Sequence, residues 1–348
     1  MNLKLDIFET IQKLCSAPAV SGFEHTAARR AALILERYAD EVCTDALGNV
    51  IGVRRAAREG AKCLLLDAHI DEIGMIVSGY ADDFLKFETV GGVDMRMLPA
   101  REVRVMTDPP LCGVITCLPP HIQTAEDMNK SIPKDKLYID LGIKNARERV
   151  PVGTPVVYNA DCVRLQNDFI SGRALDDRAG FAALLLALDM LRGKRLNIDI
   201  AIMGSVQEEV GCRGAKVGSY TVNPDFAIAV DVTHGTTPDA GAPRTFECGS
   251  GVAIGLGPNL NRSISDVLSK IARDKKIPHT LEVMEGETGT NAWPIQVARC
   301  GIPTGLLSIP LRYMHTPFET LSEADVRATA RLICEYILQL SAEVGRNA

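Results

Sequence analysis

Apolar residues fall into two recurring patterns along most of the chain. Continuous apolar runs of strand length are typical of a sheet that is covered on both faces, and apolar positions three or four residues apart are typical of helices. The expected strands lie in KCLLLDAH, NIDIAIMGSV, DFAIAVDV and IPTGLLSIP. The expected helices lie in residues 5–15, SGFEHTAARRAALILERYAD, RAGFAALLLALDMLRG, SISDVLSKIARDKK and LSEADVRATARLICEYILQLSAEV. Ser21 and Glu24 have the spacing of a capping box for the second helix. Helices interleaved with strands predict an α/β domain with a sheet between layers of helices.

The pattern changes between about residue 72 and residue 163. Short β-like runs, such as FLKFETVGG and LCGVITCL, alternate there with Gly and Pro turns, and no helical period persists. We therefore expect a small β-rich domain, residues 72–163, to be inserted into the chain. The α/β domain would then be discontinuous and consist of residues 1–71 and 164–348.

Composition and charge exclude several classes of protein. The 348 residues are 46% hydrophobic and 24% charged, as in ordinary globular proteins, and the net charge of −6 offers no basic surface to nucleic acid. No segment approaches the roughly 18 uncharged apolar residues of a membrane span, and MNLKLDIFETIQKLC lacks the long apolar stretch of a signal peptide. The ten cysteines are scattered without a CxxC pair, which favours a reduced cytoplasmic protein.

The unusual polar residues gather where the expected buried strands end or a helix begins. They are His69 and Asp71, Asp176 and Asp177, Glu208 and Glu209, Asp231 and His234, and His315. Because ligands of open α/β sheets bind beyond the carboxyl ends of the strands, we expect these groups to converge. Carboxylates crowded in this way either take up protons or bind cations. A set of His, Asp and Glu without Cys favours divalent Zn, Co or Mn, and its size favours two ions.

Spacing gives these residues different roles. His69 and Asp71 are two residues apart and share one face of an extended strand, so Asp71 is expected to orient an imidazole ligand. Glu208 and Glu209 are adjacent and would point to opposite sides of an extended chain. At a strand end the two can diverge around one site, so that one binds metal and the other takes a proton from the attacking water.

Each signal also has a simpler interpretation. Asp231 could be a turn former or a helix cap, the pair at 176–177 could cap the helix that follows, and the pair at 208–209 could lie in a solvated loop. His69 could be a core histidine bonded to Asp71. His234 could compete as a ligand, although a loop role is favoured. The joint placement at the ends of buried strands favours a shared site over separate caps.

Five motifs occur in a fixed order along the chain: AHIDEIG, ALDDRAG, QEEVGCRGA, VDVTHG and RYMHTPFE. Together they resemble the M42 family of metallo-aminopeptidases, which includes the tetrahedral (TET) and glutamyl aminopeptidases. The resemblance covers nearly the whole chain, including GGVDMRMLPAREVRV in the expected insertion. It implies a dinuclear, usually zinc- or cobalt-dependent exopeptidase on a phosphorylase/hydrolase-like α/β domain with a mixed sheet. The insertion would be a small β-barrel, a PDZ-like dimerisation domain, and dimers would assemble into a tetrahedral dodecamer.

The resemblance also implies a role for each candidate residue. The implied metal ligands are His69 and Asp231 for one ion, Glu209 and His315 for the other, and Asp176 as the bridge. A cis peptide bond is expected between Asp176 and Asp177. Glu208 resembles the general base, and Asp71 resembles the partner of His69. Asn291, in GTNA, departs from the GTDA of many relatives, which leaves the side-chain preference open.

The expected reaction is hydrolysis of the first peptide bond of a short peptide. An N-acyl amino acid deacylase is the nearest alternative, because a dinuclear site activates water equally well for either amide. A glycoside hydrolase, a label that some relatives carry, is disfavoured because two histidine ligands add nothing to that chemistry. One Trp and 5% aromatic residues also leave few platforms for sugars. A non-catalytic peptide-binding or assembly protein is disfavoured by the intact set of ligands and base.

Overall fold

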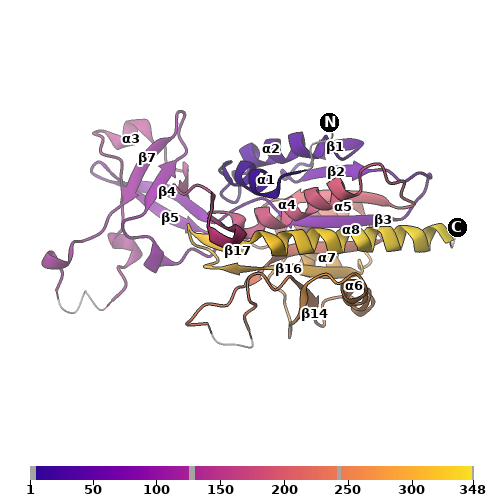
Figure 1. Cartoon of the computed structure of the whole chain (residues 1–348). Helices are drawn as coiled ribbons and strands as arrows, with labels where there is room; N and C mark the ends of the chain where they lie inside the picture. The colour runs from indigo at the N-terminus through magenta and orange to yellow at the C-terminus, as the bar shows by residue number, and fades with distance from the viewer. Residues whose placement is uncertain (1–4, 125–129, 241–243, 347–348) are drawn as a thin grey trace.

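The computed structural model describes residues 5–124, 130–240 and 244–346 (Figure 1). The helices are α1 (Ile7–Cys15), α2 (His25–Leu35), α3 (Ala146–Arg149), α4 (Leu175–Met190), α5 (Arg213–Val222), α6 (Arg262–Asp274), α7 (Ala292–Gln296) and α8 (Glu323–Arg346). The first nine strands are β1 (Glu41–Thr44), β2 (Val50–Arg54), β3 (Cys63–His69), β4 (Gly74–Ala81), β5 (Phe84–Val90), β6 (Glu102–Val105), β7 (Leu111–Ile115), β8 (Ile139–Asp140) and β9 (Pro155–Tyr158). The others are β10 (Val163–Arg164), β11 (Phe169–Gly172), β12 (Asp199–Ser205), β13 (Phe226–His234), β14 (Val252–Leu256), β15 (His279–Val283), β16 (Thr304–Arg312) and β17 (Glu319–Ser322).

A large mixed sheet carries most of these strands. Its order is β1-β2-β12-β3-β13-β16-β17-β11-β10, with β14 beside β16 and β15 beside β14. The central strands β12, β3, β13 and β16 are parallel, whereas β1, β2 and β17 pair antiparallel with their neighbours. In this register His69 pairs with Ser205, and Asp231 pairs with Ser308. The carboxyl ends of the parallel strands therefore meet at one edge of the sheet.

Helices cover both faces of this sheet, which explains why its central strands are apolar throughout. Leu64 and Leu66 belong to the core that β3 shares with α1, α4 and α8, whereas Leu65 between them belongs to the core shared with α5 and α7. Helix α4 lies between the sheet and the helices α1 and α8, and nearly all of its residues are buried. This position accounts for a helix that is apolar on all sides.

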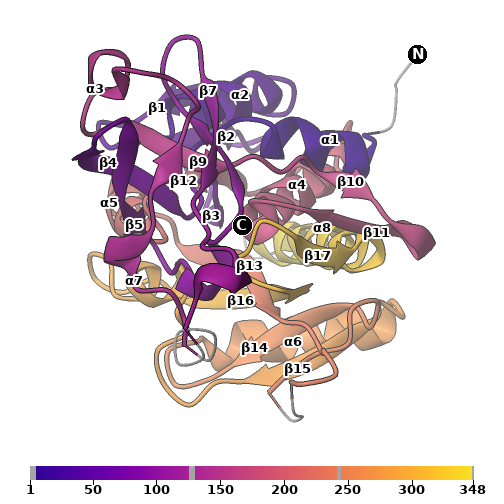
Figure 2. The same ribbon diagram turned by 90° about the vertical axis from the view of Figure 1, so that its left-hand side faces the viewer.

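A second unit contains the β-rich segment. Among the described residues, six strands close an antiparallel barrel in the order β4-β5-β8-β7-β6-β9. Its interior is a separate core that includes Met75, Leu85, Val103 and Val156. The barrel lies at the left of the large sheet in Figure 1 and faces the viewer in Figure 2. The expected β-barrel is present, whereas the boundaries at 72 and 163 and the PDZ-like assignment stay predictions.

The predicted capping box is wrong. Glu24 is the N-cap of α2, and no described side chain makes a capping hydrogen bond there. Ser21 instead donates to Asp71, and Glu24 accepts the backbone N–H groups of Gly22 and Gln207. The carboxylates and N–H groups at the strand ends are buried and need partners, so they take both side chains away from the helix. No helix in the described ranges is long and apolar enough to cross a membrane.

Candidate metal centre

The five predicted ligands come from distant segments of the chain and meet beyond the carboxyl ends of the strands. His69 ends β3, Asp231 lies near the end of β13, Glu209 follows β12, His315 follows β16, and Asp176 lies in the first turn of α4. His69, Asp176 and Asp231 are buried, and Glu209 and His315 are partly buried. Parallel register places these strand ends side by side, so residues separated by more than a hundred positions become neighbours.

Asp176 lies between two groups of ligand atoms. Its Oδ1 is 3.0 Å from Nε2 of His69, and its Oδ2 is 3.5 Å from Nε2 of His315. Nε2 of His315 is also 3.2 Å from Oε2 of Glu209. Ligand atoms of His69, Asp176 and Asp231 all lie within 4.8 Å of one another, and so do those of Asp176, Glu209 and His315. The five residues thus form two triads that share one carboxylate.

The spacing and chemistry of the triads fit divalent metal ions. Two ligand atoms about 2.0–2.1 Å from a tetrahedral zinc lie roughly 3.3 Å apart. The N–O distances of 3.0 Å, 3.2 Å and 3.5 Å within the triads match this spacing. Imidazole and carboxylate donors without thiolate suit Zn, Co or Mn. Each triad could therefore hold a cation.

The crowded charges shift pKa values in the direction that neutralises the cluster. Burial opposes the charged form of His69, but its hydrogen bond to Asp176 and its close contact with Asp71 outweigh burial and raise its pKa well above the ordinary value. Burial is likewise outweighed at His315, where hydrogen bonds to Asp176 and Glu209 raise the pKa to about 11. At Asp231 burial itself raises the pKa well above the usual range. Raised pKa values favour protonated His and Asp side chains, so the cluster favours added positive charge.

Glu208 and Glu209 diverge, as their spacing predicts. Glu209 faces His315, whereas Oε1 of Glu208 lies 3.2 Å from Sγ of Cys212 and its side chain lines the adjoining pocket. Burial raises the pKa of Glu208 to about 7. A carboxyl group that titrates near neutral pH can both accept and return a proton.

Two buried carboxylates hold the loop that carries this pair. Asp71 accepts the N–H of Glu208 on Oδ1 at 3.0 Å and the N–H of the next residue on Oδ2 at 3.2 Å. Oε1 of Glu24 accepts the N–H of Gln207 at 3.1 Å. Oδ1 of Asp71 also lies 3.4 Å from Nδ1 of His69. The predicted partner of His69 therefore also positions the backbone of both glutamates.

Glu319 is a site residue that the sequence reasoning missed. Its Oε1 accepts the N–H of His315 at 3.0 Å, and its Oε2 accepts the N–H of Asp176 at 3.1 Å. The carboxyl group is buried, and burial raises its pKa well above the ordinary value. Glu319 thereby positions the backbones of two predicted ligands. It is the last residue of RYMHTPFE, and this motif was the signal that could have revealed it.

A buried ion cluster supports the turn from β11 to α4. Glu72 pairs with Arg173 and Arg178, and all three side chains are buried. Burial would raise the pKa of Glu72, but the two arginines outweigh burial and lower it. Because the arginines stand on either side of Asp176 in the sequence, the cluster fixes the segment that carries the shared carboxylate.

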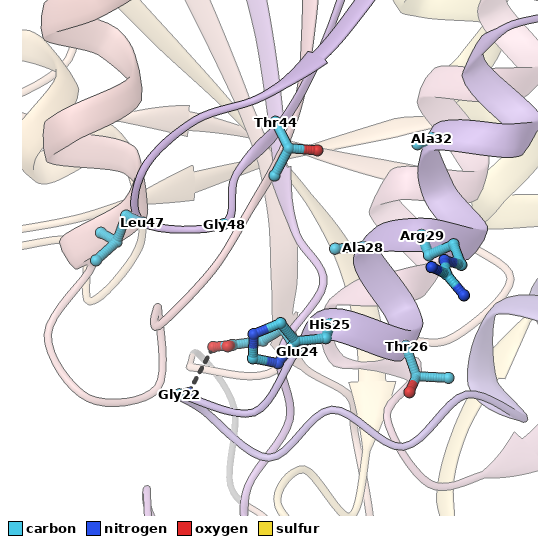
Figure 3. A pocket seen from close by; sticks show the side chains of 10 residues that line it. All are labelled: Gly22, Glu24, His25, Thr26, Ala28, Arg29, Ala32, Thr44, Leu47 and Gly48. Atoms are coloured by element: carbon cyan, nitrogen blue, oxygen red, sulfur yellow. Dashed lines mark hydrogen bonds between the residues drawn. The ribbon is translucent and has the colours of Figure 1, made fainter.

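The ligand triads open into a pocket of about 530 Å³. A second pocket, of about 710 Å³, lies beside the start of α2 and is lined by residues that include Glu24, His25, Arg29 and Leu47 (Figure 3). Figure 3 shows the hydrogen bond from Gly22 to Glu24 at its lower edge. This larger pocket contains neither triad, so the candidate metal site adjoins the smaller one.

The remaining predicted positions have distinct surroundings. His234 is exposed, lines the smaller pocket and belongs to neither triad. The expected cis peptide bond between Asp176 and Asp177 is present. Oδ1 of Asp177 accepts the N–H of Gly180 at 3.1 Å, so the helix-cap interpretation fits Asp177. Asn291 is buried and donates to the hydroxyl of Ser205 at 2.8 Å.

Comparison with known proteins agrees with this arrangement. The profile of the family described as M42 glutamyl aminopeptidase matches residues 48–332. A lysyl aminopeptidase from Pyrococcus furiosus is 34% identical, over 93% of this chain and 95% of the relative. A TET aminopeptidase structure from a marine sediment archaeon, Thaumarchaeota archaeon, superposes with a TM-score of 0.91 at 30% identity, over 98% of each chain. The Pyrococcus horikoshii TET1 peptidase superposes with a TM-score of 0.83 at 30% identity, over 95% of this chain and 99% of that one.

These similarities define an aminopeptidase-type hydrolase. The chain belongs to the M42 aminopeptidase family, which is metal-dependent.

Proposed function

We propose that this protein removes N-terminal residues from short peptides with the help of two divalent metal ions. The observation that carries the proposal is the pair of ligand triads that share Asp176 and open, with Glu208, into one pocket. Two ligand sets joined by one carboxylate suit a pair of ions better than a single ion. The M42 family profile supports the reaction class.

In this proposal His69 and Asp231 hold one ion, Glu209 and His315 hold the other, and Asp176 binds both. Zinc is the first candidate, with cobalt and manganese as alternatives. When bound, such ions polarise the scissile carbonyl group and make water acidic enough to attack near neutral pH. Nδ1 of His315 lies 3.1 Å from the carbonyl oxygen of Gly92. Because a carbonyl only accepts hydrogen bonds, Nδ1 carries the proton and Nε2 is free to face the ion.

Glu208 is the proposed general base. It accepts a proton from the attacking water and returns that proton to the leaving amine. A pKa raised by burial to about 7 suits both steps. Asp71 keeps Glu208 in place by accepting its backbone N–H, and at the same time orients His69.

The variant Glu208→Gln tests this assignment because it keeps all five ligands. We expect metal content, measured by mass spectrometry, to match that of the wild type, while turnover falls by about 10²- to 10⁴-fold. The exposed Glu36, changed to Gln, is the matched control. Turnover near the wild-type rate in metal-loaded Glu208→Gln would refute the base assignment.

A substrate panel separates the rival reactions. Aminoacyl-p-nitroanilides report aminopeptidase activity, N-acetyl amino acids report a deacylase, and short glucans report a glycoside hydrolase. We expect hydrolysis of the first set alone and its loss after treatment with a chelator. Cleavage of N-acetyl amino acids at a higher kcat/KM than aminoacyl substrates would favour the deacylase. Glucan cleavage that survives the chelator would favour the glycosidase.

We also propose that the barrel, as a PDZ-like domain of residues 72–163, mediates dimerisation and that dimers build a tetrahedral dodecamer. The related TET1 peptidase is described as able to form a tetrahedron or a large octahedral shell. The ten cysteines are all free, as expected for the proposed cytoplasmic location. Light scattering on the purified protein tests the assembly, and a monomeric mass would contradict it.

A further inference from the structure

The wall of the metal-site pocket carries a carboxylate with no assigned role. Glu282, in β15, lines the same pocket as Glu208 and four of the five proposed ligands. Its Oε1 accepts a hydrogen bond from the hydroxyl of Thr233. Its Oε2 is buried and makes no hydrogen bond of regular geometry, and the hydroxyl of Ser308, which also lacks such a bond, is the neutral donor beside the carboxylate. A buried carboxylate oxygen without a regular hydrogen bond is costly, and such a group calls for an explanation.

The register of β13 places Glu282 close to the reaction centre. Thr233, which holds Glu282, lies two residues after the proposed ligand Asp231 on the same strand. Residues two apart share one face and are separated by roughly 6.5–7 Å. Both line the pocket. The carboxylate of Glu282 therefore lies about one amino-acid side chain away from the proposed ions, where the first side chain of a bound peptide would reach.

The charge around Glu282 is negative. The described residues that line the pocket include no Lys or Arg, and their carboxylates include Glu208 and Glu282. Arg244 lines a neighbouring pocket that Glu282 also borders, but it forms no ion pair with Glu282 among the described residues. Burial raises the pKa of Glu282, although the hydroxyl groups of Thr233 and Ser308 and, less strongly, the nearby His234 oppose this shift. A cationic ligand group would supply the missing counter-charge.

The same pocket also offers apolar surface. Val232, Met284 and Met314 line it together with Glu282. A long side chain with an apolar stem and a charged end matches such a wall, because the stem packs on apolar groups while the head reaches the carboxylate. A carboxylate at that position would instead meet repulsion from Glu282.

We propose that Glu282 recognises the cationic side chain of the N-terminal residue, so that the enzyme prefers peptides that begin with Lys or Arg and disfavours those that begin with Glu. This inference rests on the proposed aminopeptidase function and names its substrate class. Glu282 touches the substrate side chain and takes no part in the bond cleavage itself.

The kinetic test compares kcat/KM for Lys-, Arg-, Leu- and Glu-p-nitroanilide in the metal-loaded wild type and in Glu282→Gln. The glutamine retains an oxygen that can accept the hydrogen bond from Thr233, so it removes charge with little change in shape. Glu285→Gln is the matched control, because Glu285 is exposed and lines the neighbouring pocket only. We expect the Lys-to-Leu ratio of kcat/KM to fall about 10- to 100-fold in Glu282→Gln and to stay unchanged in Glu285→Gln.

A binding measurement separates failure of this inference from failure of the proposed function. Calorimetry with free L-lysine and L-norleucine, whose apolar stems match, reports recognition without turnover. Tighter binding of lysine by the wild type, lost in Glu282→Gln, supports the inference even if no substrate is cleaved. In that case the proposed function alone is wrong. The inference is overturned if norleucine binds as tightly as lysine, if the wild type prefers Glu or Leu substrates, or if Glu282→Gln slows all four substrates equally.

Discussion

Gly92 lies so close to His315 that a Cβ atom on the glycine would be 2.6 Å from Nδ1 of the imidazole. Such a distance is well below van der Waals contact. The carbonyl oxygen of the same glycine is the hydrogen-bond partner of Nδ1. The barrel segment that follows β5 therefore holds a proposed metal ligand that follows β16 of the large sheet.

The first prediction concerns this contact. Gly92→Ala should push the ring of His315 out of place and weaken metal binding by about 10- to 100-fold, as loss of a ligand's supporting hydrogen bond does elsewhere. Metal content after dialysis, and activity at rising metal concentration, measure the effect. Gly79→Ala is the control, because a Cβ there would meet no atom closer than 3.9 Å. Full metal retention in Gly92→Ala would show that the contact is unimportant.

The second prediction concerns the loop that carries the proposed base. Glu24→Ala removes the acceptor of the Gln207 N–H and should lower kcat by about 10- to 100-fold, because a small displacement of a catalytic group is costly. Metal content should stay at the wild-type level, since Glu24 belongs to neither triad. Glu24→Gln, which keeps an acceptor oxygen, should recover most of the activity. Equal losses in both variants would indicate that the charge matters, and not the hydrogen bond.

The third prediction concerns the buried ion cluster. Glu72→Gln leaves Arg173 and Arg178 without their partner and should lower the free energy of unfolding by about 3–5 kcal/mol. Urea denaturation of chelator-treated protein measures this change. Glu41→Gln is the control, because the pair of Glu41 with Arg55 is exposed and should contribute less than about 1 kcal/mol. A loss below that level in Glu72→Gln would contradict the prediction.

The same cluster has a defined pH dependence. The folded-state pKa of Glu72 is lowered by the two arginines, so the folded state releases this proton more readily than the unfolded chain does. Its stabilisation is therefore fully present above the unfolded pKa of about 4.3 and is lost as the pH falls through the lower folded value. We expect stability to fall less steeply between pH 5 and pH 3 in Glu72→Gln than in the wild type.

The fifth prediction concerns protons released by metal binding. His69 and His315 have raised pKa values in the cluster, and an imidazole must lose a proton before Nε2 can bind metal. Zinc binding at pH 7.5 should therefore release protons, including those of the two imidazoles, and metal affinity should weaken as the pH falls. Calorimetry in buffers of different ionisation enthalpy counts these protons. His234→Gln should release the same number, whereas heats that do not depend on the buffer would contradict the prediction.

The sequence predicted where the proposed ligands gather, because polar residues interrupt a strong apolar pattern there. His69 and Asp231 stand at the ends of runs that are apolar on both faces, where a polar side chain has no structural purpose. The side chains that accept hydrogen bonds from backbone N–H groups of the site could not be found in this way. Glu24 has the spacing of a helix cap but binds the N–H of Gln207, a residue 183 positions away. Glu319 accepts the backbone N–H groups of two proposed ligands, and no periodicity marks such a contact.

In the barrel, too, local sequence patterns predicted the strands but not the contacts between distant segments. Short runs with Gly and Pro turns predicted β structure, but its closure depends on pairing between β4 and β9, which are far apart in sequence. The contact of Gly92 with His315 likewise depends on how the barrel meets the sheet. Local patterns determine elements, whereas these pairings depend on the whole chain.

A single carboxylate common to both triads would make the two proposed cation positions interdependent. An ion beside His69 would pull Oδ1 of Asp176 into a fixed orientation and thereby prepare Oδ2 for the second ion, while its own charge would repel that ion. The fixed orientation of Asp176 would favour binding of the second ion, whereas repulsion between the two ions would oppose it. The balance between them decides whether activity rises steeply or in two separate stages as the cation is titrated into the protein.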